Sequence, residues 1–240
     1  MNAAANYASS RFWVPRTGVV DLLSDGGFLL DPAQTIFRSR TPPPAALPEL
    51  RKYRALGLLG EPGMGKSTTL KAEACRLAAE PSDENVISLH IDLRDFSSET
   101  LLCQRVFESP KVIAWKSGAT HLVLHLDSLD EALLRIDSIA NLIASELRQL
   151  PTDRLSIRIA CRTAVWPERT LEPALKEIWG DAAVGIFELA PLRRVDVTAA
   201  AEQRAICENA PDSDPARVWC ISLSNHANHL LWRGHVSREK

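Results

Sequence analysis

The sequence predicts an α/β fold in which a five-stranded, mostly parallel sheet is flanked by helices. From Ala55 onward, short apolar runs alternate with stretches of helical period, which is typical of a parallel sheet covered on both faces. A glycine-rich turn follows the first apolar run, and a cluster of acids follows the third. The chain of 240 residues is long enough for one such domain and an appendage.

Apolar runs and helical periods place the elements in order. We expect strands over Leu56–Leu59, Val86–Asp92, His121–Asp127, Leu155–Cys161 and Val184–Leu189. We expect helices over Thr68–Ala79, Glu99–Glu108, Asp137–Leu150, Pro167–Trp179 and Val195–Glu208. Strands joined by crossover helices form a doubly wound sheet, which binds ligands at the carboxyl ends of its strands.

Three segments are expected along the chain. Residues 1–52 form an irregular N-terminal leader and Pro-rich linker, because proline and glycine interrupt them and no period is sustained. Within this leader, Phe12–Val14 and Phe28–Leu30 are too apolar for a free tail, so we expect them to pack. Residues 53–210 form the α/β domain. Residues 211–240 are poorly patterned, and we expect a loosely held tail.

The composition of the chain indicates which partners and which cellular compartment to expect. A net charge of −2 gives no bulk positive charge for a nucleic acid, so a nucleic-acid partner is not indicated. No apolar run is long enough for a membrane span, and no signal peptide begins the chain, so we expect a cytoplasmic protein without a membrane partner. The five cysteines are widely spaced, which indicates neither a disulfide framework nor a zinc site.

The segment Gly60–Ser67 has the pattern Gly-x4-Gly-Lys-Ser of a phosphate-binding loop. Glycines let backbone N–H groups close around phosphate oxygens, Lys66 adds a positive charge, and the Ser67 hydroxyl can bind Mg²⁺. The following helix directs its N-terminal amides at the phosphates. A glycine-rich turn without a ligand is the alternative, which the flanking strand and helix disfavour. The expected nucleotide-binding residues are Gly60, Glu61, Pro62, Gly63, Met64, Gly65, Lys66, Ser67 and Thr68.

The acidic cluster follows the apolar strand His121–Asp127. This strand delivers Asp127 to the carboxyl edge of the sheet, where its carboxylate can hold Mg²⁺ opposite Ser67. Asp130 and Glu131 lie within one turn, and such close acids suit one metal ligand and one residue that activates the attacking water. The alternative is that Asp127 ends a strand and the other two acids cap a helix. Both Asp130 and Glu131 remain candidates for the base.

Three further polar residues are placed by the predicted strands. Arg162 directly follows the strand Leu155–Cys161, so it falls at the edge that carries the phosphate loop. There it can reach a γ-phosphate and distinguish ATP from ADP; the alternative is an ordinary surface or salt-bridging arginine. His90 and His125 lie inside strands, and we expect hydrogen-bonded histidines without a catalytic role.

These motifs resemble those of the NACHT branch of the STAND signalling NTPases, which is similar to AAA+ proteins in core topology. Gly60–Ser67 resembles Walker A, and His121–Glu131 resembles Walker B with its small residue Ser128. Arg162 matches the position of the family's sensor arginine. The resemblance covers about residues 11–208. It implies an ATP/ADP–Mg²⁺ switch that controls self-association in defence signalling, including antiphage defence, with slow ATP hydrolysis and Glu131 as the main base.

The family continues into a nucleotide-contacting helical segment and a long sensor region, which residues 211–240 do not resemble. We therefore interpret the chain as a module that lacks the C-terminal sensor region, which leaves a nucleotide-binding remnant, a partner-dependent subunit or a regulatory fragment. Its partners would be the nucleotide and either a second copy of itself or a sensor or effector protein. Two rival functions stay open. An AAA+-like remodelling ATPase would need an arginine finger, for which Arg193 and Arg194 are candidates. A catalytically inactive P-loop interaction module would use Phe12, Trp13 and the Trp-containing tail of residues 211–240 for partners.

Overall fold

The computed structural model describes residues 11–16, 27–32, 43–79 and 86–199. The chain is a mixed α/β protein with a mostly parallel sheet flanked by helices, which confirms the predicted fold class. The sheet has seven strands rather than five. Contacts divide the chain into a larger unit, residues 47–189, and a smaller unit made of residues 1–46 and 190–240.

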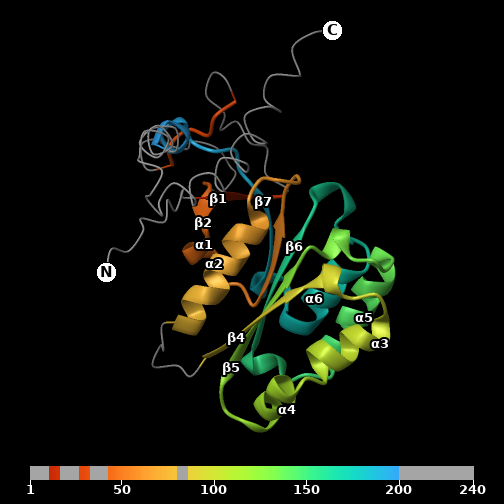
Figure 1. Ribbon diagram of the computed structural model, residues 1–240. Helices are drawn as coiled ribbons and strands as arrows, with labels where there is room; N and C mark the ends of the chain where they lie inside the picture. Colours follow the sequence, from red (N-terminus) through yellow and green to blue (C-terminus); the bar gives the residue numbers. More distant parts are fainter. Residues whose placement is uncertain (1–10, 17–26, 33–42, 80–85, 200–240) are drawn as a thin grey trace, which may run out of the picture. The chain divides into compact units, whose positions relative to one another are not determined.

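The larger unit contains five parallel strands in the order β7-β3-β6-β5-β4 (Figure 1). They match the predicted ranges to within one residue: β3 (Ala55–Leu59), β4 (Val86–Asp92), β5 (His121–Asp127), β6 (Leu155–Cys161) and β7 (Val184–Leu189). In the register, Leu59 pairs with Cys161, and Asp92 pairs with Asp127. The carboxyl ends of these strands therefore form one edge, and the segments that follow them share it.

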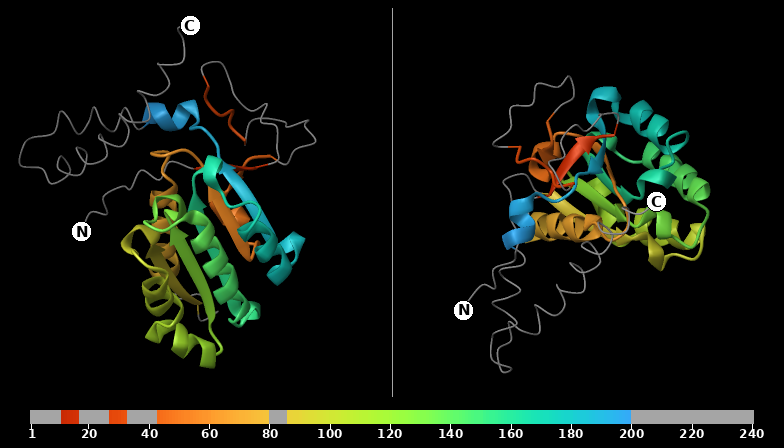
Figure 2. Two further views of the ribbon diagram at one scale, coloured as in Figure 1. Left: turned by 90° about the vertical axis from the view of Figure 1, so that its right-hand side faces the viewer. Right: turned by 90° about the horizontal axis from the view of Figure 1, so that it is seen from above.

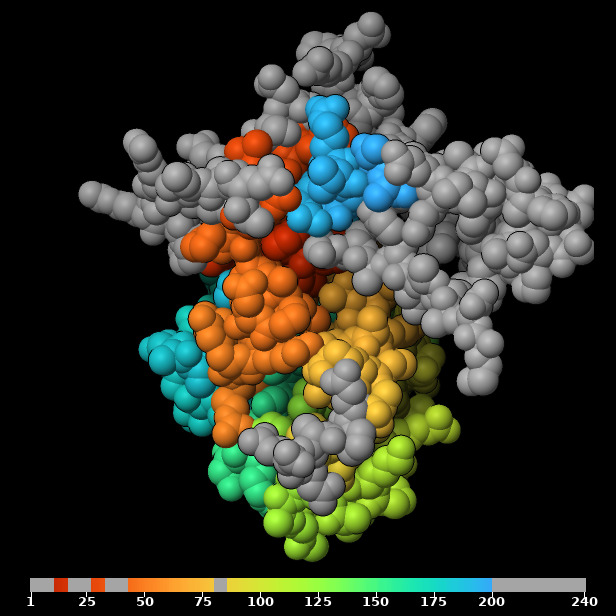
Figure 3. All heavy atoms as spheres, turned by 90° about the vertical axis from the view of Figure 1, so that its left-hand side faces the viewer, coloured from red at the N-terminus to blue at the C-terminus, as the bar shows by residue number. Residues whose placement is uncertain are grey.

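Helices cover both faces of these strands. The helices are α1 (Leu47–Leu50), α2 (Lys66–Ala79), α3 (Glu99–Leu102), α4 (Pro110–Ser117), α5 (Ile136–Arg148) and α6 (Leu171–Trp179). Figures 1 and 2 show α2 on one face and α3 to α6 on the other. Figure 3 shows the side of the larger unit on which α1 and α2 lie. No helix among the described residues has the length and apolar character needed to cross a membrane.

Helix boundaries differ from the sequence expectations for local reasons. The predicted helix Glu99–Glu108 is α3 followed by a π-helical turn over Cys103–Phe107. The helix expected from Pro167 begins only at Leu171. The unpredicted α4 begins where Ser109 accepts a hydrogen bond from Val112 N, and Pro110 occupies its first turn. Proline is favoured there because its missing N–H would have no partner within the helix.

The two faces of the larger unit's sheet differ in polarity. Leu122, Leu124 and Leu126 point into an apolar core shared with α5, α6 and Trp115 of α4. The alternate residues of the same strands face α2, and they include the buried side chains of His125 and Arg158. Side chains alternate across a strand, so one strand can serve both environments. The face beneath α2 is thus an unusually polar interior surface.

Glu73 of α2 anchors this polar face to the segment before β3. Arg51 Nε and Nη2 donate to the two carboxylate oxygens of Glu73 at 2.7 and 2.8 Å. Arg76 adds contacts at 3.1 and 3.2 Å from the next turn of α2. Arg158 donates to the carbonyls of Arg54, Ile157 and Arg51. Burial raises the pKa of Glu73, but the hydrogen bonds from the two arginines outweigh it and lower the pKa to about 2.

We expect Glu73 to make the stability of the fold depend on pH in the acid range. Its folded pKa lies below its ordinary value of 4.5, so its contribution is complete above the unfolded pKa and is lost as pH falls toward about 2. The shift corresponds to about 3 kcal/mol of unfolding free energy. Denaturant unfolding at a series of pH values measures this loss. Glu73→Gln cannot ionise and should show a shallower fall; equal slopes in parent and variant would contradict the assignment.

The smaller unit corrects the expectation of an irregular leader. β1 (Phe12–Pro15) pairs in antiparallel fashion with β2 (Ala45–Ala46). Val14 and Leu29 form a small apolar cluster with Ala190 and Phe12. A run of four residues is too short to show a period, although its aromatic and β-branched side chains favour a strand. Residues 194–199 are helical; the rest of the predicted helix Val195–Glu208, and the tail 211–240, lie outside the described residues.

Candidate functional site

The phosphate-binding motif forms the turn between β3 and α2. Gly60, Gly63 and Gly65 have φ values of +154°, +77° and +95°. Nothing lies within 4 Å of where a Cβ of Gly63 or Gly65 would be, so backbone conformation rather than space requires glycine at these two positions. α2 begins at Lys66, two residues before its predicted start, so Lys66, Ser67 and Thr68 form its first turn.

Lys66 places its ammonium group against the loop. Nζ donates to the carbonyl oxygen of Gly60 at 2.6 Å and to that of Glu61 at 3.0 Å. Burial lowers the pKa of Lys66, and the nearby carboxylates of Asp130, Glu61 and Glu131 oppose this shift. The positive charge therefore lies beside the turn whose amides would hold phosphate, and the acids of the second motif stabilise it.

Ser67 and Asp127 meet at the carboxyl edge of the sheet. The Ser67 hydroxyl donates to Asp127 Oδ1 at 2.9 Å, although the two residues are 60 positions apart in the chain. Asp127 ends β5 as predicted and is buried. Its other oxygen, Oδ2, is buried without a hydrogen-bond partner in the described part of the chain. A hydroxyl beside a carboxylate with an unsatisfied oxygen fits the oxygen ligands that Mg²⁺ prefers.

The protein contribution to such a metal site would be small. Within residues 11–16, 27–32, 43–79 and 86–199, no three His, Cys, Asp or Glu side chains are grouped so that they could hold a metal ion. Asp127 and Ser67 therefore supply one carboxylate and one hydroxyl. Mg²⁺ commonly takes only one or two protein ligands and completes its shell with water and substrate phosphates.

The turn after β5 places the side chains of Asp130 and Glu131 in different surroundings. Ser128 has a left-handed backbone conformation with φ +58°, and Leu129–Glu131 form a short 3₁₀ helix. The side chain of Asp130 is only 4% exposed, and its Oδ2 lies 2.6 Å from Arg162 Nε. The backbone N–H of Arg162 also donates to Asp130 Oδ1 at 3.0 Å. Asp130 is thus committed to Arg162, which follows β6 as predicted.

Glu131 lies between two arginines and remains open to solvent. Its side chain is 39% exposed, and its two carboxylate oxygens lie 3.6 Å from Arg94 Nη1 and 3.7 Å from Arg162 Nη2. The residues alone left both acids as candidates for the base, and only the family resemblance favoured Glu131. Their surroundings differ, because one is buried beneath an arginine and the other can contact water.

The structure adds Arg94 and Asp92, which sequence reasoning did not select. Arg94 donates to both carboxylate oxygens of Asp92, at 2.9 and 2.6 Å, and reaches Glu131 from there. These hydrogen bonds lower the pKa of Asp92 and raise that of Arg94. Their position in the sequence could have identified them. Asp92 ends the predicted strand Val86–Asp92, so Asp92 and Arg94 fall at the same edge of the sheet as Asp127.

The two strand histidines are buried to different degrees. His125 is fully buried, and both of its ring nitrogens lack a hydrogen-bond partner among the described residues, so the expectation of a hydrogen-bonded histidine is wrong there. Burial, together with the charge of Arg158, lowers its pKa to about 4. His90 is half-buried, and burial lowers its pKa against the opposing effect of Asp127. The His125 ring is therefore uncharged at neutral pH.

The arginine-finger candidates have partners within the smaller unit. Arg193 donates to both carboxylate oxygens of Asp196, at 2.8 and 2.9 Å, and to Asp31 at 3.3 Å. The guanidinium of Arg194 lies 4.7 Å from the centre of the Phe28 ring. The side chains of Arg193 and Arg194 therefore both have partners within the smaller unit.

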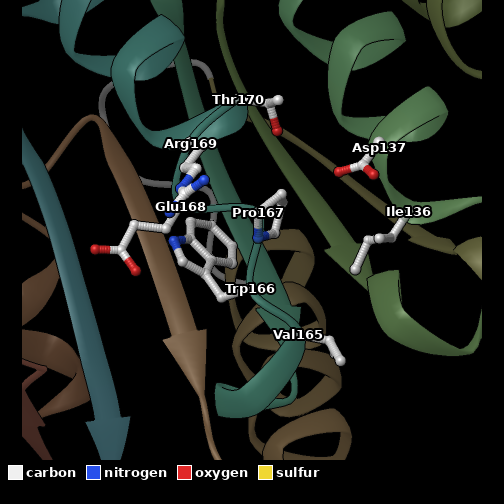
Figure 4. A pocket seen from close by; sticks show the side chains of 8 residues that line it. All are labelled: Ile136, Asp137, Val165, Trp166, Pro167, Glu168, Arg169 and Thr170. Atoms are coloured by element: carbon white, nitrogen blue, oxygen red, sulfur yellow. The ribbon is translucent and has the colours of Figure 1, made fainter.

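A cavity of about 380 Å³ lies between the loop after β6 and the start of α5 (Figure 4). In Figure 4, Trp166 and Arg169 lie across the opening from Ile136 and Asp137. Its full lining is Ile136, Asp137, Val165, Trp166, Pro167, Glu168, Arg169 and Thr170. None of these residues belongs to the phosphate loop or the acidic cluster. The candidate nucleotide site is therefore defined by its motifs and contacts rather than by this cavity.

No family model matches the chain, and no curated protein matches its sequence. Similar solved structures include Cdc6p from Pyrobaculum aerophilum, with 18% identity, 62% of this chain and 42% of that chain covered, and a TM-score of 0.46. A DNA replication initiation factor has 12% identity, coverage of 76% and 55%, and a TM-score of 0.47. PCH-2 of C. elegans has 18% identity, coverage of 64% and 39%, and a TM-score of 0.41. The chain thus spans roughly half or less of these three proteins. With similarities this low, its own residues are the evidence for its function.

Proposed function

We propose that this chain is a P-loop module that binds ATP or ADP with Mg²⁺. The 2.9 Å contact between Ser67 Oγ and Asp127 Oδ1 carries the proposal. It joins a glycine-rich loop at the start of α2 to a buried carboxylate at the end of β5, at the edge where parallel sheets bind ligands. A nucleotide-bound Mg²⁺ would use both residues.

Each part of the site would have a separate task in binding. The loop amides and the first turn of α2 would hold the phosphates, and the Lys66 ammonium would exchange its two carbonyl partners for phosphate oxygens. Ser67 and Asp127 would hold Mg²⁺, which neutralises phosphate charge. Thr68 lies in the same turn of α2 and is exposed, and we propose that its hydroxyl and amide contribute to phosphate binding.

Hydrolysis would be slow and would depend on the residue that is open to water. Glu131 would orient and deprotonate the attacking water, since its carboxylate is exposed. Asp130 would hold Arg162 in place through the 2.6 Å contact. Arg162 is 44% exposed, so it would offer its free guanidinium edge to a γ-phosphate. An arginine shared between two acids and a phosphate suits a sensor of the nucleotide state.

We further propose that the module is a NACHT-like switch of a signalling or defence protein, in which the nucleotide state controls self-association or contact with a sensor or effector partner. The support is the pattern Asp127-Ser128-Leu129-Asp130-Glu131, in which the small Ser128 turns the chain with a left-handed backbone. The rival remodelling ATPase is less well supported, because Arg193 and Arg194 are engaged within their own unit. An inactive interaction module would show no ATP turnover, so measuring turnover together with nucleotide affinity distinguishes it from the other two functions.

Replacement of Asp127 by asparagine tests this function directly. The parent should bind ADP more tightly with Mg²⁺ than with EDTA, and Asp127→Asn should lose about 10-fold or more of that gain, because one charged metal ligand is removed. Affinity without metal should change little. Calorimetric titrations of both proteins under both conditions give the four dissociation constants.

Asp137→Asn is the matched control, since it removes an exposed carboxylate from the first turn of α5, outside the candidate site. It should behave as the parent does. The proposed function is wrong if the folded parent binds neither ATP nor ADP in the presence of Mg²⁺.

A further inference from the structure

The carboxylate of Asp127 is held unequally at its two oxygens. Oδ1 accepts the hydrogen bond from Ser67, whereas Oδ2 is buried and has no hydrogen-bond partner among the described residues. His90 Nε2 lies 3.7 Å from Oδ2 and is likewise buried without a partner in that part of the chain. Burying a polar atom without a hydrogen-bond partner is unfavourable, so the two atoms have a common reason to form a hydrogen bond with each other.

The strand register places His90 beside this oxygen. β4 and β5 pair in parallel, with Asp92 opposite Asp127 and His90 opposite His125. His90 and Asp92 lie on the same face of β4, and that face is shared with Asp127 across the strand pair. The backbone of two hydrogen-bonded strands, rather than a mobile loop, therefore places the imidazole within a small side-chain rotation of the carboxylate.

We propose that His90 is a positioning residue that orients the Asp127 carboxylate for Mg²⁺, an inference that rests on the proposed nucleotide function. Ser67 has one hydroxyl proton, and it donates that proton only to Oδ1, even if a lone pair of its oxygen would bind Mg²⁺. The N–H of His90 is then the donor that keeps the carboxylate from rotating. Donors behind a metal ligand commonly act in this way.

The test compares three variants of β4 by the same titrations with Mg²⁺ and with EDTA. His90→Leu removes the donor and should reduce the Mg²⁺-dependent gain in ADP affinity by about 10- to 100-fold, with the metal-free affinity unchanged. His90→Gln keeps an N–H at the end of a side chain of similar reach and should retain most of the gain. Ser88→Ala is the matched control, because Ser88 shares the face of β4 but pairs with Val123, further from Asp127.

Each result bears on one proposal. A folded parent without nucleotide affinity would refute the nucleotide function itself. A parent with a Mg²⁺ gain that His90→Leu preserves would refute the positioning role, and so would a loss of metal-free affinity in His90→Leu.

If thermal unfolding shows that His90→Leu does not fold, His90→Asn replaces it, since its amide is too short to reach Oδ2. It should show the same loss of gain. In the Asp127→Asn background, His90→Asn should have no further effect on the gain, whereas additive losses would overturn the inference.

Discussion

Replacement of Lys66 by alanine is expected to raise the Kd for ATP by on the order of 100-fold, which removes binding from the range of a calorimetric titration. The ammonium group is the charge that lies against the loop, 2.6 Å from the Gly60 carbonyl and 3.0 Å from that of Glu61. In the variant, the amides of the loop would remain, but no side chain would balance the phosphate charge. Charge-assisted contacts to phosphate are the stronger class of hydrogen bond, so their loss dominates.

The fold should survive this change, because Lys66 lies in the first turn of α2 and alanine is a good helix former. Lys71→Ala is the matched control: it removes the same charge from an exposed position of the same helix. ATP at about 100 times the parent's Kd should stabilise the parent and the control by about 2.7 kcal/mol, and Lys66→Ala by only about 0.4 kcal/mol. Equal affinity of parent and Lys66→Ala would mean that the loop is a glycine-rich turn without a phosphate.

The strands were predictable from sequence because buried parallel strands are continuous apolar runs. His121–Asp127 and Leu155–Cys161 were placed to the residue, and β3 to within one residue. Elements set by single local contacts were not predictable in this way. The short α4 depends on the capping hydroxyl of Ser109. β1 has four residues and too little length for a period.

The residues of the candidate site also fall into a predictable and an unpredictable group. Motif spacing identified Lys66, Ser67 and Asp127, because each occupies a fixed place relative to a glycine loop or a strand end. Contacts between strands were not accessible, since they depend on strand order and register. Arg94 reaches Glu131, and His90 lies beside Asp127, because β4 is the neighbour of β5. The sequence does not show that β4 and β5 are neighbours in the sheet.

The polar face beneath α2 is a second example of contacts that the sequence does not predict. Glu73 and Arg158 look like ordinary charged residues in sequence, one within a helix and one within a strand. In the fold they are buried, with Glu73 bonded to Arg51 and Arg76 and Arg158 bonded to backbone carbonyls. A helical or strand pattern reports which residues share a face, but not which side chains from other elements neutralise them.

Glu131→Gln is expected to slow ATP turnover by on the order of 100-fold or more while ATP affinity stays within a few-fold of the parent. Glutamine keeps the shape of the side chain but loses the negative charge and with it the ability to take a proton. Because Glu131 is the exposed acid of the pair, water can reach it without any rearrangement of the fold. Single-turnover hydrolysis and a nucleotide titration on the same samples measure the two quantities separately.

Asp130→Asn makes the comparison informative, because Asp130 is buried and paired with Arg162. Asparagine can still accept the backbone N–H of Arg162 but loses the charge opposite its guanidinium. We expect this variant to change the ratio of ATP to ADP affinity, since Arg162 is freed, and to retain more turnover than Glu131→Gln. The double variant should still bind ATP. If it loses binding, both acids belong to the metal site beside Asp127, and the division of roles between base and sensor support is wrong.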